Sequence, residues 1–341
     1  MSTPLPTNMA SASLGTLATG FWASRAIYVA AKIGVVDLLA RGPRSVDFLA
    51  ETIECDKDAL YRLLRALSTT GLFIDRSNGV FELTELGQIL GSDVEGSMRN
   101  YVMMLGRPES WRAWEHLEQS IMTGVPAFQH EYQMPLFQYL AAHPPIARVF
   151  DEGMRSRGVA DDDAIAKAYD FSAFNRIIDV GGGAGRLLST ILKSTPRARG
   201  VLFDLPHVVE GSRNSIVELG TGQRIECVGG DFFAAIPAAG DLYLLKQVIH
   251  DWSDEQAAEI LGNCRSAMNK ASKLLIFEVI LAPESAYPKM LDLMMLVWTG
   301  GRERTEEEYE QLLTGAGLKL TRIVPTGTAI SVLEVARSDA V

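Results

Sequence analysis

Seven short apolar runs follow one another in the C-terminal half of this 341-residue chain. Helical patterns separate the first five runs, and such alternation favours a parallel, doubly wound α/β sheet. A turn around Gly327 joins the last two runs as a hairpin, which adds an antiparallel edge. The predicted strands are Arg176–Val180, Gly200–Phe203, Arg224–Val228, Asp241–Leu245, Lys273–Phe277, Leu318–Val324 and Ser331–Val335.

The first 100 residues predict a separate, mostly helical unit. Residues 1–12 are small and polar, and we expect them to be partly disordered. A long helix from Leu14 to Ile33 carries apolar residues on more than one face, so we expect it to need a second partner, such as a sister subunit. Three helices and a hairpin with the topology of a winged helix then follow, at Val35–Leu39, Val46–Ile53, Ala59–Leu67 and residues 72–83.

The charges argue against nucleic acid as a partner, although winged helices raise DNA binding as a candidate function. Residues 1–100 carry nine Lys/Arg and eleven Asp/Glu, and the whole chain has a net charge of −10. A DNA-binding unit would present a basic face. No apolar stretch reaches the roughly 18 to 20 residues that span a bilayer, and the first six residues do not resemble a signal peptide. We therefore expect a cytoplasmic protein with no membrane partner.

A glycine cluster, Gly181–Gly185, directly follows the first predicted strand and opens a helix. Ligands of open α/β sheets bind beyond the carboxyl ends of the strands, where glycines let the backbone approach them closely. The spacing G-x-G-x-G differs from the dinucleotide fingerprint G-x-G-x-x-G. The cluster therefore predicts a nucleotide-type cofactor and disfavours NAD.

Two acids at the next strand ends refine the cofactor. Asp204 ends the second strand, where a carboxylate accepts hydrogen bonds from ribose hydroxyls. Asp231 and Phe232 follow the third strand, where an acid accepts from an exocyclic amine and an aromatic ring stacks on adenine. Each acid taken singly is also explained by helix capping. As an ordered set they favour S-adenosylmethionine (SAM), which has a ribose and an adenine but no phosphate.

His250 follows the fourth predicted strand, in the stretch Lys246-Gln247-Val248-Ile249-His250-Asp251-Trp252. A histidine taken alone is more often a structural residue. Its place beside the cofactor crevice favours a general base instead, because imidazole accepts a proton near neutral pH. This arrangement predicts a transfer reaction that begins with removal of a proton.

Nearly the whole chain resembles the SAM-dependent O-methyltransferases of the caffeic-acid type, whose bacterial members act on secondary metabolites. The most specific motifs are Asp179-Val180-Gly181-Gly182-Gly183, Gly230-Asp231-Phe232-Phe233, Lys246–Trp252 and Gly300-Gly301-Arg302-Glu303-Arg304-Thr305. The resemblance implies a Rossmann-like methyltransferase domain with an antiparallel last strand, preceded by a winged-helix dimerisation domain, and a homodimer. We expect a dimerisation domain over residues 1–100, a helical connection that contributes to the substrate pocket over 101–170, and a SAM-binding domain over 171–341.

The resemblance also implies roles for individual residues. His250 matches the catalytic base, and Glu278 and Glu303 match the acids that flank and orient it. The expected SAM-binding residues are Asp179, Gly181, Gly183, Asp204, Gly230, Asp231, Phe232 and Lys246. The segment after Glu278 is shorter than in plant relatives, so the substrate-pocket candidates Met154, Met290, Met294 and Trp298 are a separate hypothesis. No metal site is expected.

The predicted activity is metal-independent transfer of a methyl group from SAM to a hydroxyl of an aromatic or quinone-like small molecule, with S-adenosylhomocysteine (SAH) as product. A rival is a relative that keeps SAM but hydroxylates or decarboxylates a polyketide-type substrate. A second rival is a DNA-binding regulator with SAM as its ligand. A magnesium mechanism would need a carboxylate cluster at the reaction centre, for which Glu278 and Glu303 are a conceivable pair.

Overall fold

The computed structural model describes residues 7–340, and its backbone contacts divide the chain into two compact units. Unit 1 comprises Met1–Trp111 and Arg148–Arg157, and unit 2 comprises Arg112–Ala147 and Gly158–Val341. The helical connection expected over residues 101–170 is thus shared between the units. The expectations for residues 1–6 lie outside the described part, whereas residues 7–12, also expected to be partly disordered, are helical.

Unit 1 combines helices with a small antiparallel sheet of strand order β1-β3-β2. Its strands are β1 (Arg44–Ser45), β2 (Phe73–Asp75) and β3 (Val80–Leu83). Its helices are α1 (Thr7–Ala18), α2 (Gly20–Ile33), α3 (Val35–Leu39), α4 (Val46–Ile53), α5 (Lys57–Ser68), α6 (Glu85–Gln88), α7 (Arg99–Leu105) and the first residues of α8 (Pro108–Ala113). The three short helices and the hairpin predicted between residues 35 and 83 are present.

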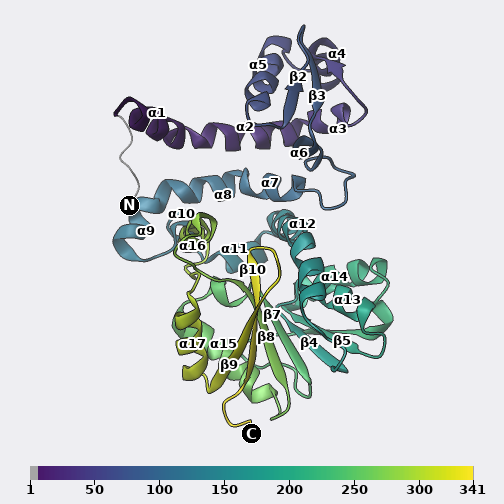
Figure 1. Ribbon diagram of the computed structural model, residues 1–341, viewed down its shortest axis with the longest axis vertical. Helices are drawn as coiled ribbons and strands as arrows, with labels where there is room; N and C mark the ends of the chain where they lie inside the picture. The colour runs from purple at the N-terminus through teal and green to yellow at the C-terminus, as the bar shows by residue number, and fades with distance from the viewer. Residues whose placement is uncertain (1–6, 341) are drawn as a thin grey trace. The chain divides into compact units, whose positions relative to one another are not determined.

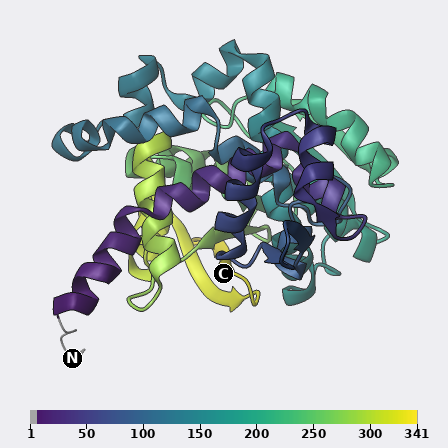
Figure 2. The same cartoon turned by 90° about the horizontal axis from the view of Figure 1, so that it is seen from above.

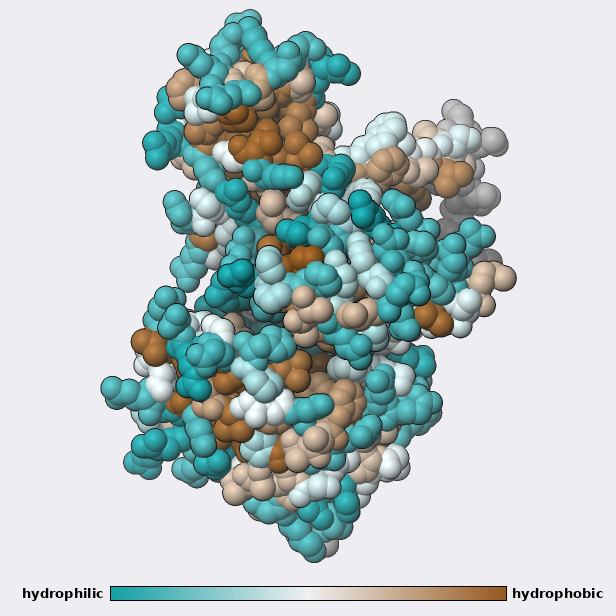
Figure 3. Space-filling model, turned by 180° about the vertical axis from the view of Figure 1, so that it is seen from behind, coloured by the Kyte–Doolittle hydropathy of each residue, from teal (hydrophilic) through white to brown (hydrophobic). Residues whose placement is uncertain are grey.

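Helix α5 illustrates why these elements form. Asp56 caps it, because its Oδ1 accepts a hydrogen bond of 2.7 Å from the backbone N–H of Ala59. Leu60, Leu64 and Leu67 recur at helical spacing and are buried in the core of the unit. Seen from behind, hydrophobic surface is also visible over the part of the molecule that carries α4, α5 and the hairpin (Figure 3).

The helix expected from Leu14 to Ile33 is interrupted. Thr19 separates α1 from α2, and its hydroxyl donates to the carbonyl of Gly15 at 2.9 Å. The backbone N–H of Thr19 also donates to this carbonyl, at 3.1 Å. Both helices continue in one direction as an extended arm (Figure 2). The arm exposes large apolar side chains, at Leu14, Leu17, Phe21 and Trp22.

Unit 2 is built on a seven-stranded sheet (Figure 1) of strand order β6-β5-β4-β7-β8-β10-β9. The strands are β4 (Arg176–Val180), β5 (Arg199–Asp204), β6 (Ile225–Gly229), β7 (Leu242–Lys246), β8 (Lys273–Val279), β9 (Leu318–Pro325) and β10 (Ile330–Arg337). The first five are parallel, and β10 is antiparallel to both β8 and β9. The α/β fold with an antiparallel last strand is confirmed. The antiparallel strand lies second from the edge, however, and β9 forms the edge.

The helices of this unit include one long helix, α12, which also belongs in part to unit 1. They are η1 (Trp114–His116), α9 (Leu117–Thr123), α10 (Ala127–Tyr132), α11 (Leu136–Ala142), α12 (Pro144–Ala168), α13 (Arg186–Ser194), α14 (Pro206–Glu218), η2 (Gly222–Arg224), η3 (Ile249–Asp251), α15 (Asp254–Ala267), α16 (Ala286–Trp298) and α17 (Glu306–Gly315). No helix among residues 7–340 is both long enough and apolar enough to cross a membrane.

Helices cover both faces of the sheet, as the doubly wound pattern requires. Successive residues of a strand point to opposite faces. Ile177 accordingly packs in one core with Leu188 of α13, and Ile178 packs in the other with Ile260 of α15. Because both faces are covered, the loops after the strands are the part of the sheet left for a ligand.

Candidate active site

The residues expected to bind SAM lie at the carboxyl ends of neighbouring parallel strands. The glycine turn follows β4, Asp204 is the last residue of β5, and Asp231 comes two residues after β6. Lys246 is the last residue of β7. Since β6, β5, β4 and β7 are adjacent in the sheet, the fold brings these residues together along the carboxyl ends of the strands.

The turn after β4 contains three glycines with positive φ, at positions 181, 183 and 185. Gly181 and Gly183 have φ angles of 67° and 56°, in the left-handed region that side chains other than glycine rarely adopt. A Cβ on Gly181 would lie 2.9 Å from Val248, whereas one on Gly183 would meet nothing within 4 Å. The open space at Gly183 is therefore a cradle that a side chain would fill, which fits a bound nucleoside.

Asp204 closes the turn from the neighbouring strand. Its Oδ2 accepts from the backbone N–H of Gly183 at 2.8 Å, and its Oδ1 accepts from Leu205 at 2.7 Å. Burial raises the pKa of Asp204, while these two hydrogen bonds act in the opposite direction. A carboxylate has about four lone-pair sites. Both oxygens thus keep capacity to accept from a ribose.

Aromatic rings gather beside the Asp231 turn. Asp231 Oδ1 accepts from the backbone N–H of Phe233 at 2.9 Å, which orders the turn. Phe232 and Phe233 meet the ring of Trp252 edge-on, at centroid distances of 5.9 and 4.8 Å, and Phe137 stacks on Trp252 at 5.6 Å. The contributions of Trp252 and Phe137 were not predicted from the sequence.

Lys246 has partners that sequence reasoning missed. Its Nζ donates to Asp162 Oδ1 at 2.5 Å, and Asp162 Oδ2 lies 3.4 Å from Nε of Arg186. Burial raises the pKa of Asp162, and the two cations oppose that shift. Asp179 lies deeper, and burial raises its pKa to about 7. Asp162 stands within three consecutive acids of a helix, a pattern that gave no functional signal.

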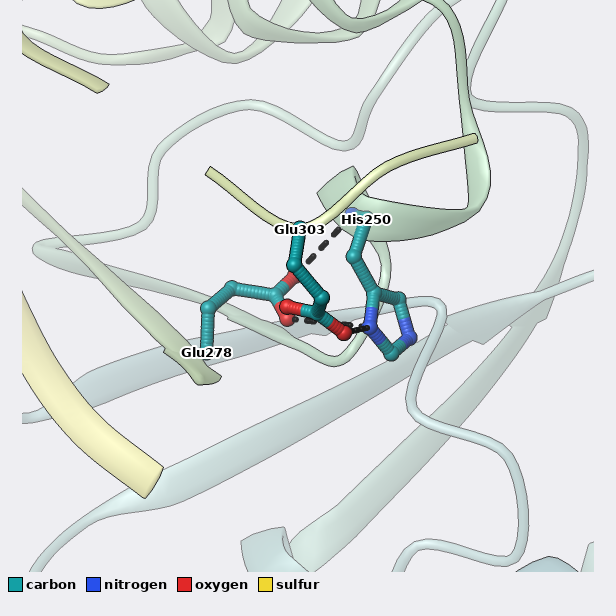
Figure 4. A group of neighbouring side chains, drawn as sticks. All are labelled: His250, Glu278 and Glu303. Atoms are coloured by element: carbon teal, nitrogen blue, oxygen red, sulfur yellow. Dashed lines mark hydrogen bonds and ion pairs between the residues drawn. The ribbon is translucent and has the colours of Figure 1, made fainter. Parts of the chain in front are cut away.

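His250, Glu278 and Glu303 are brought together from η3, β8 and the loop before α17 (Figure 4). His250 Nδ1 lies 2.7 Å from Glu303 Oε1 and 3.5 Å from Glu278 Oε2. An ionised carboxylate only accepts hydrogen bonds, so Nδ1 donates this bond when Glu303 is ionised. Nε2 lies 3.9 Å from Asp251 Oδ1, beyond hydrogen-bond distance, which leaves this nitrogen for a ligand.

The three side chains are buried together, and the pKa values of His250 and Glu278 are shifted. Burial alone would lower the pKa of His250, but the negative charges of Glu278 and Asp251 and the hydrogen bond to Glu303 raise it to about 10. Burial raises the pKa of Glu278 to about 7, and the positive charge of His250 opposes that shift. The arrangement makes His250 an unusually strong base.

The loop that carries His250 is held from two sides. Glu278 Oε1 accepts from the backbone N–H groups of Ile249 and His250, at 3.0 and 3.3 Å. The buried Arg304 donates to the carbonyls of Ile249 and Trp252, at 3.1 and 2.9 Å. The loop backbone also passes so close to Gly301 that a Cβ there would lie 2.0 Å from the His250 carbonyl oxygen. The role of Arg304 was not predicted from the sequence, although it lies in the Gly300–Thr305 motif.

The substrate-pocket candidates are not gathered in one unit. Met290, Met294 and Trp298 recur every fourth residue of α16, so they share one stripe of that helix. Met290 is exposed, while Met294 packs against the sheet core and Trp298 is buried. Met154 belongs to unit 1. Their role in substrate binding stays a prediction.

Comparison with known proteins identifies the family. Residues 114–319 match the O-methyltransferase domain, and residues 16–93 match the O-methyltransferase dimerisation domain. The chain belongs to the SAM-dependent O-methyltransferases. This confirms the family and the cofactor predicted from the motifs.

Several relatives are similar over almost their whole length. Phenazine O-methyltransferase PhzM of Lysobacter antibioticus is 43% identical over 319 residues, covering 93% of both chains. Phenazine-1-carboxylate N-methyltransferase of Pseudomonas aeruginosa is 32% identical and covers 97% of this chain and 99% of its own. A solved O-methyltransferase from neocarzinostatin biosynthesis, in complex with SAM and 2-hydroxy-5-methyl naphthoic acid, is 32% identical, with a TM-score of 0.79 over 92% of this chain and 95% of its own.

Proposed function

We propose that this methyltransferase acts on a hydroxyl group of a small aromatic or quinone-like molecule, with His250 as general base and without a metal ion. The observation that carries the proposal is the pair of His250 Nδ1 and Glu303 Oε1 at 2.7 Å, which leaves Nε2 of the neutral imidazole as the acceptor nitrogen. Relatives named for phenazine and naphthoate substrates support an aromatic acceptor.

The chemistry explains why a strong base is useful. SAM supplies a methyl group on a positively charged sulfur, and that methyl moves to the acceptor oxygen while the electron pair of the broken bond stays on sulfur. A phenol has a pKa near 10, so its oxygen is a poor nucleophile at neutral pH. A pKa of about 10 for His250 matches that of the phenol, so transfer of the proton to a neutral His250 costs little free energy. Because His250 with this pKa is mostly protonated at neutral pH, the transfer rate should rise with pH as the neutral imidazole becomes populated.

Glu303 and Glu278 have different parts in this proposal. Glu303 accepts a hydrogen bond from Nδ1–H, which fixes the tautomer and stabilises the imidazolium formed when Nε2 takes up the proton of the acceptor hydroxyl. Glu278 holds the backbone of the loop through two N–H groups and adds a second negative charge 3.5 Å from Nδ1. Both are therefore positioning residues.

The same three side chains offer one ligand atom each within 4.8 Å of one another, a geometry that a metal ion also accepts. We favour catalysis without a metal because His250 Nδ1 is already hydrogen-bonded to Glu303. A metal held through Nδ1 would have to displace the bond to Glu303, whereas Glu278 Oε2 and Glu303 Oε2 have no hydrogen-bond partner among the described residues. Removal of divalent cations is the direct test.

We assign the cofactor pocket to the glycine turn and the strand ends. Gly181 and Gly183, with Asp179 beneath them, form the cradle. Asp204 is the acceptor for the ribose hydroxyls. The expected adenine side consists of Gly230, Asp231 and Phe232, and Lys246 is the cation for the carboxylate of SAM. The donor set fits SAM, because carboxylates and one lysine match its hydroxyls, amine and carboxylate.

We infer that the chain forms a homodimer. The α1–α2 arm exposes Leu14, Leu17, Phe21 and Trp22, and this arm overlaps the region that matches the dimerisation domain. Exposed apolar area of this kind is typical of subunit interfaces. Light scattering at micromolar concentration should give about twice the monomer mass of 37.2 kDa. A monomeric mass would contradict the proposal.

The activity is tested by incubating the protein with SAM and a panel of hydroxylated phenazines, naphthoates and quinones, each paired with an amino analogue. We expect O-methylated product and SAH in equal amounts, detected by mass spectrometry. Methylation of the amino analogues alone would favour an N-methyltransferase, as in some relatives. A hydroxylated or decarboxylated product would favour the rival chemistry.

A further inference from the structure

Helix α12 contributes a buried acid to the cofactor side of the sheet. Asp162 is 3% exposed and lies between two cations from different elements, Lys246 at the end of β7 and Arg186 at the start of α13. Its Oδ1 accepts from Lys246 Nζ at 2.5 Å, and its Oδ2 lies 3.4 Å from Arg186 Nε. A buried acid between two cations at the edge of a ligand crevice calls for a specific explanation.

The helix face is shaped for this contact. Gly158 lies one turn before Asp162, on the same face of α12. A Cβ on Gly158 would lie 3.1 Å from Lys246 Nζ, and the Gly158 carbonyl oxygen lies 3.4 Å from the same atom. Glycine at this position therefore lets the lysine approach the helix closely. Two residues of α12 thus face the end of β7.

The two cations keep hydrogen-bonding capacity. Lys246 has three N–H donors, of which Asp162 and the Gly158 carbonyl account for two. Arg186 Nε is buried and, among the described residues, has no hydrogen-bond partner, because its contact with Asp162 is an ion pair only. These remaining donors suit a carboxylate. The nearby acid, Asp162, suits a cationic group beside that carboxylate.

We propose that Asp162 completes the subsite for the amino-acid end of SAM. It accepts a hydrogen bond from the α-ammonium group and holds Lys246 and Arg186 toward the α-carboxylate. A zwitterion is recognised by a negative and a positive group at neighbouring points. Asp162 provides the negative group, and Lys246 and Arg186 provide the positive ones. Asp179 is the alternative acid, but its carboxylate lies against the backbone of Gly182. A Cβ added to Gly182 would lie 2.7 Å from that carboxylate. The inference rests on the cofactor pocket assigned under the proposed function.

Binding of three ligands separates this role from the rest of the pocket. SAH carries the complete amino-acid end, its des-amino analogue lacks only the α-ammonium group, and 5′-methylthioadenosine lacks the whole amino-acid end. The test is calorimetric titration of each ligand into wild type, Asp162→Asn and the control Asp163→Asn. Asp163 is the exposed neighbour on the same helix, with its carboxylate 3.7 Å from Arg186.

For Asp162→Asn we expect SAH to bind about tenfold or more weakly, the size of a lost hydrogen bond to a charged group. Methylthioadenosine should bind within about twofold of wild type, because the adenosine subsite is untouched. Wild type should prefer SAH to the des-amino analogue, and Asp162→Asn should lose that preference. Asp163→Asn should match wild type with all three ligands.

Three results would overturn the inference. Unchanged SAH affinity in Asp162→Asn removes the residue from the subsite, and equal weakening of methylthioadenosine shows a general structural effect. If Asp162→Asn does not fold, wild type alone decides, because equal binding of SAH and the des-amino analogue means that no acid recognises the ammonium group. Wild type that binds neither SAH nor methylthioadenosine contradicts the cofactor pocket itself, which is a separate failure.

Discussion

Replacement of Glu303 by glutamine removes one negative charge beside His250 and keeps the shape of the side chain. Glu303 Oε1 lies 2.7 Å from Nδ1, and both residues are buried. At an effective dielectric constant of about 20, two unit charges about 4 Å apart interact by about 4 kcal/mol. A hydrogen bond to a charged group loses about 1 to 2 kcal/mol when its partner becomes neutral.

These two values bracket the expected effect. Since about 1.4 kcal/mol corresponds to one pKa unit, the pKa of His250 should fall by about 1 to 3 units in Glu303→Gln. Glu278 remains 3.5 Å from Nδ1, so part of the shift from the ordinary value should persist. The pKa of His250 can only fall in this variant, because loss of a negative charge disfavours the protonated imidazole.

The pKa is measured without knowledge of the acceptor. Histidine labelled with ¹⁵N gives ring signals for the five histidines of the chain, and a His250→Asn sample assigns the relevant one. Titration of wild type should show a midpoint well above the ordinary 6.5, and Glu303→Gln should show it at lower pH. Once an acceptor is known, the rise of kcat/KM with pH should move in the same direction. An unchanged or higher midpoint in the variant would refute the account of the pair.

Three further predictions test other parts of the structure. Asp204→Ala should weaken SAM binding by about tenfold or more through lost ribose hydrogen bonds, and unchanged calorimetry would remove Asp204 from the pocket. Turnover should survive dialysis against EDTA, and loss of activity restored by a divalent cation would show a metal role for His250, Glu278 and Glu303. Glu334 is buried, yet hydrogen bonds from Lys273, Tyr169 and Arg322 lower its pKa to about 2. Its stabilisation is therefore present above about pH 4.5 and lost toward pH 2, so the Tm difference between wild type and Glu334→Gln should shrink over that range; a constant difference would contradict this.

The sheet was predictable because strand and helix periodicities differ along the sequence. Runs such as Arg176–Val180 are short, apolar and bounded by turn residues. The observed strand β4 begins and ends at the predicted residues. The break at Thr19, whose φ and ψ are −97° and 5°, was not predicted, because the apolar pattern from Leu14 to Ile33 runs through it. The position of β10 between β8 and β9 was missed for another reason: a hairpin pattern does not state which strand lies at the edge.

Part of the candidate site was also predictable from the sequence, and part was not. The alternation of strands and helices alone indicates that the glycine turn and Asp204 lie at the carboxyl ends of neighbouring strands. Glu303, 53 residues from His250 along the chain, was assigned by family resemblance, and only the fold explains their contact. Asp162 is separated from Lys246 by 84 residues and sits on a helix with an ordinary pattern. Such a contact depends on how α12 packs, which no local signal in the sequence encodes.

The central claim is that His250 removes the proton from the acceptor hydroxyl. The most direct measurement compares wild type with His250→Asn in single-turnover methyl transfer from SAM to the hydroxylated aromatic that the screen identifies, with SAH affinity measured in parallel. General-base catalysis predicts a loss of about 10²- to 10⁴-fold in the transfer rate, while SAH binds as in wild type. A transfer rate close to wild type in a variant that binds SAH normally would contradict the role of His250.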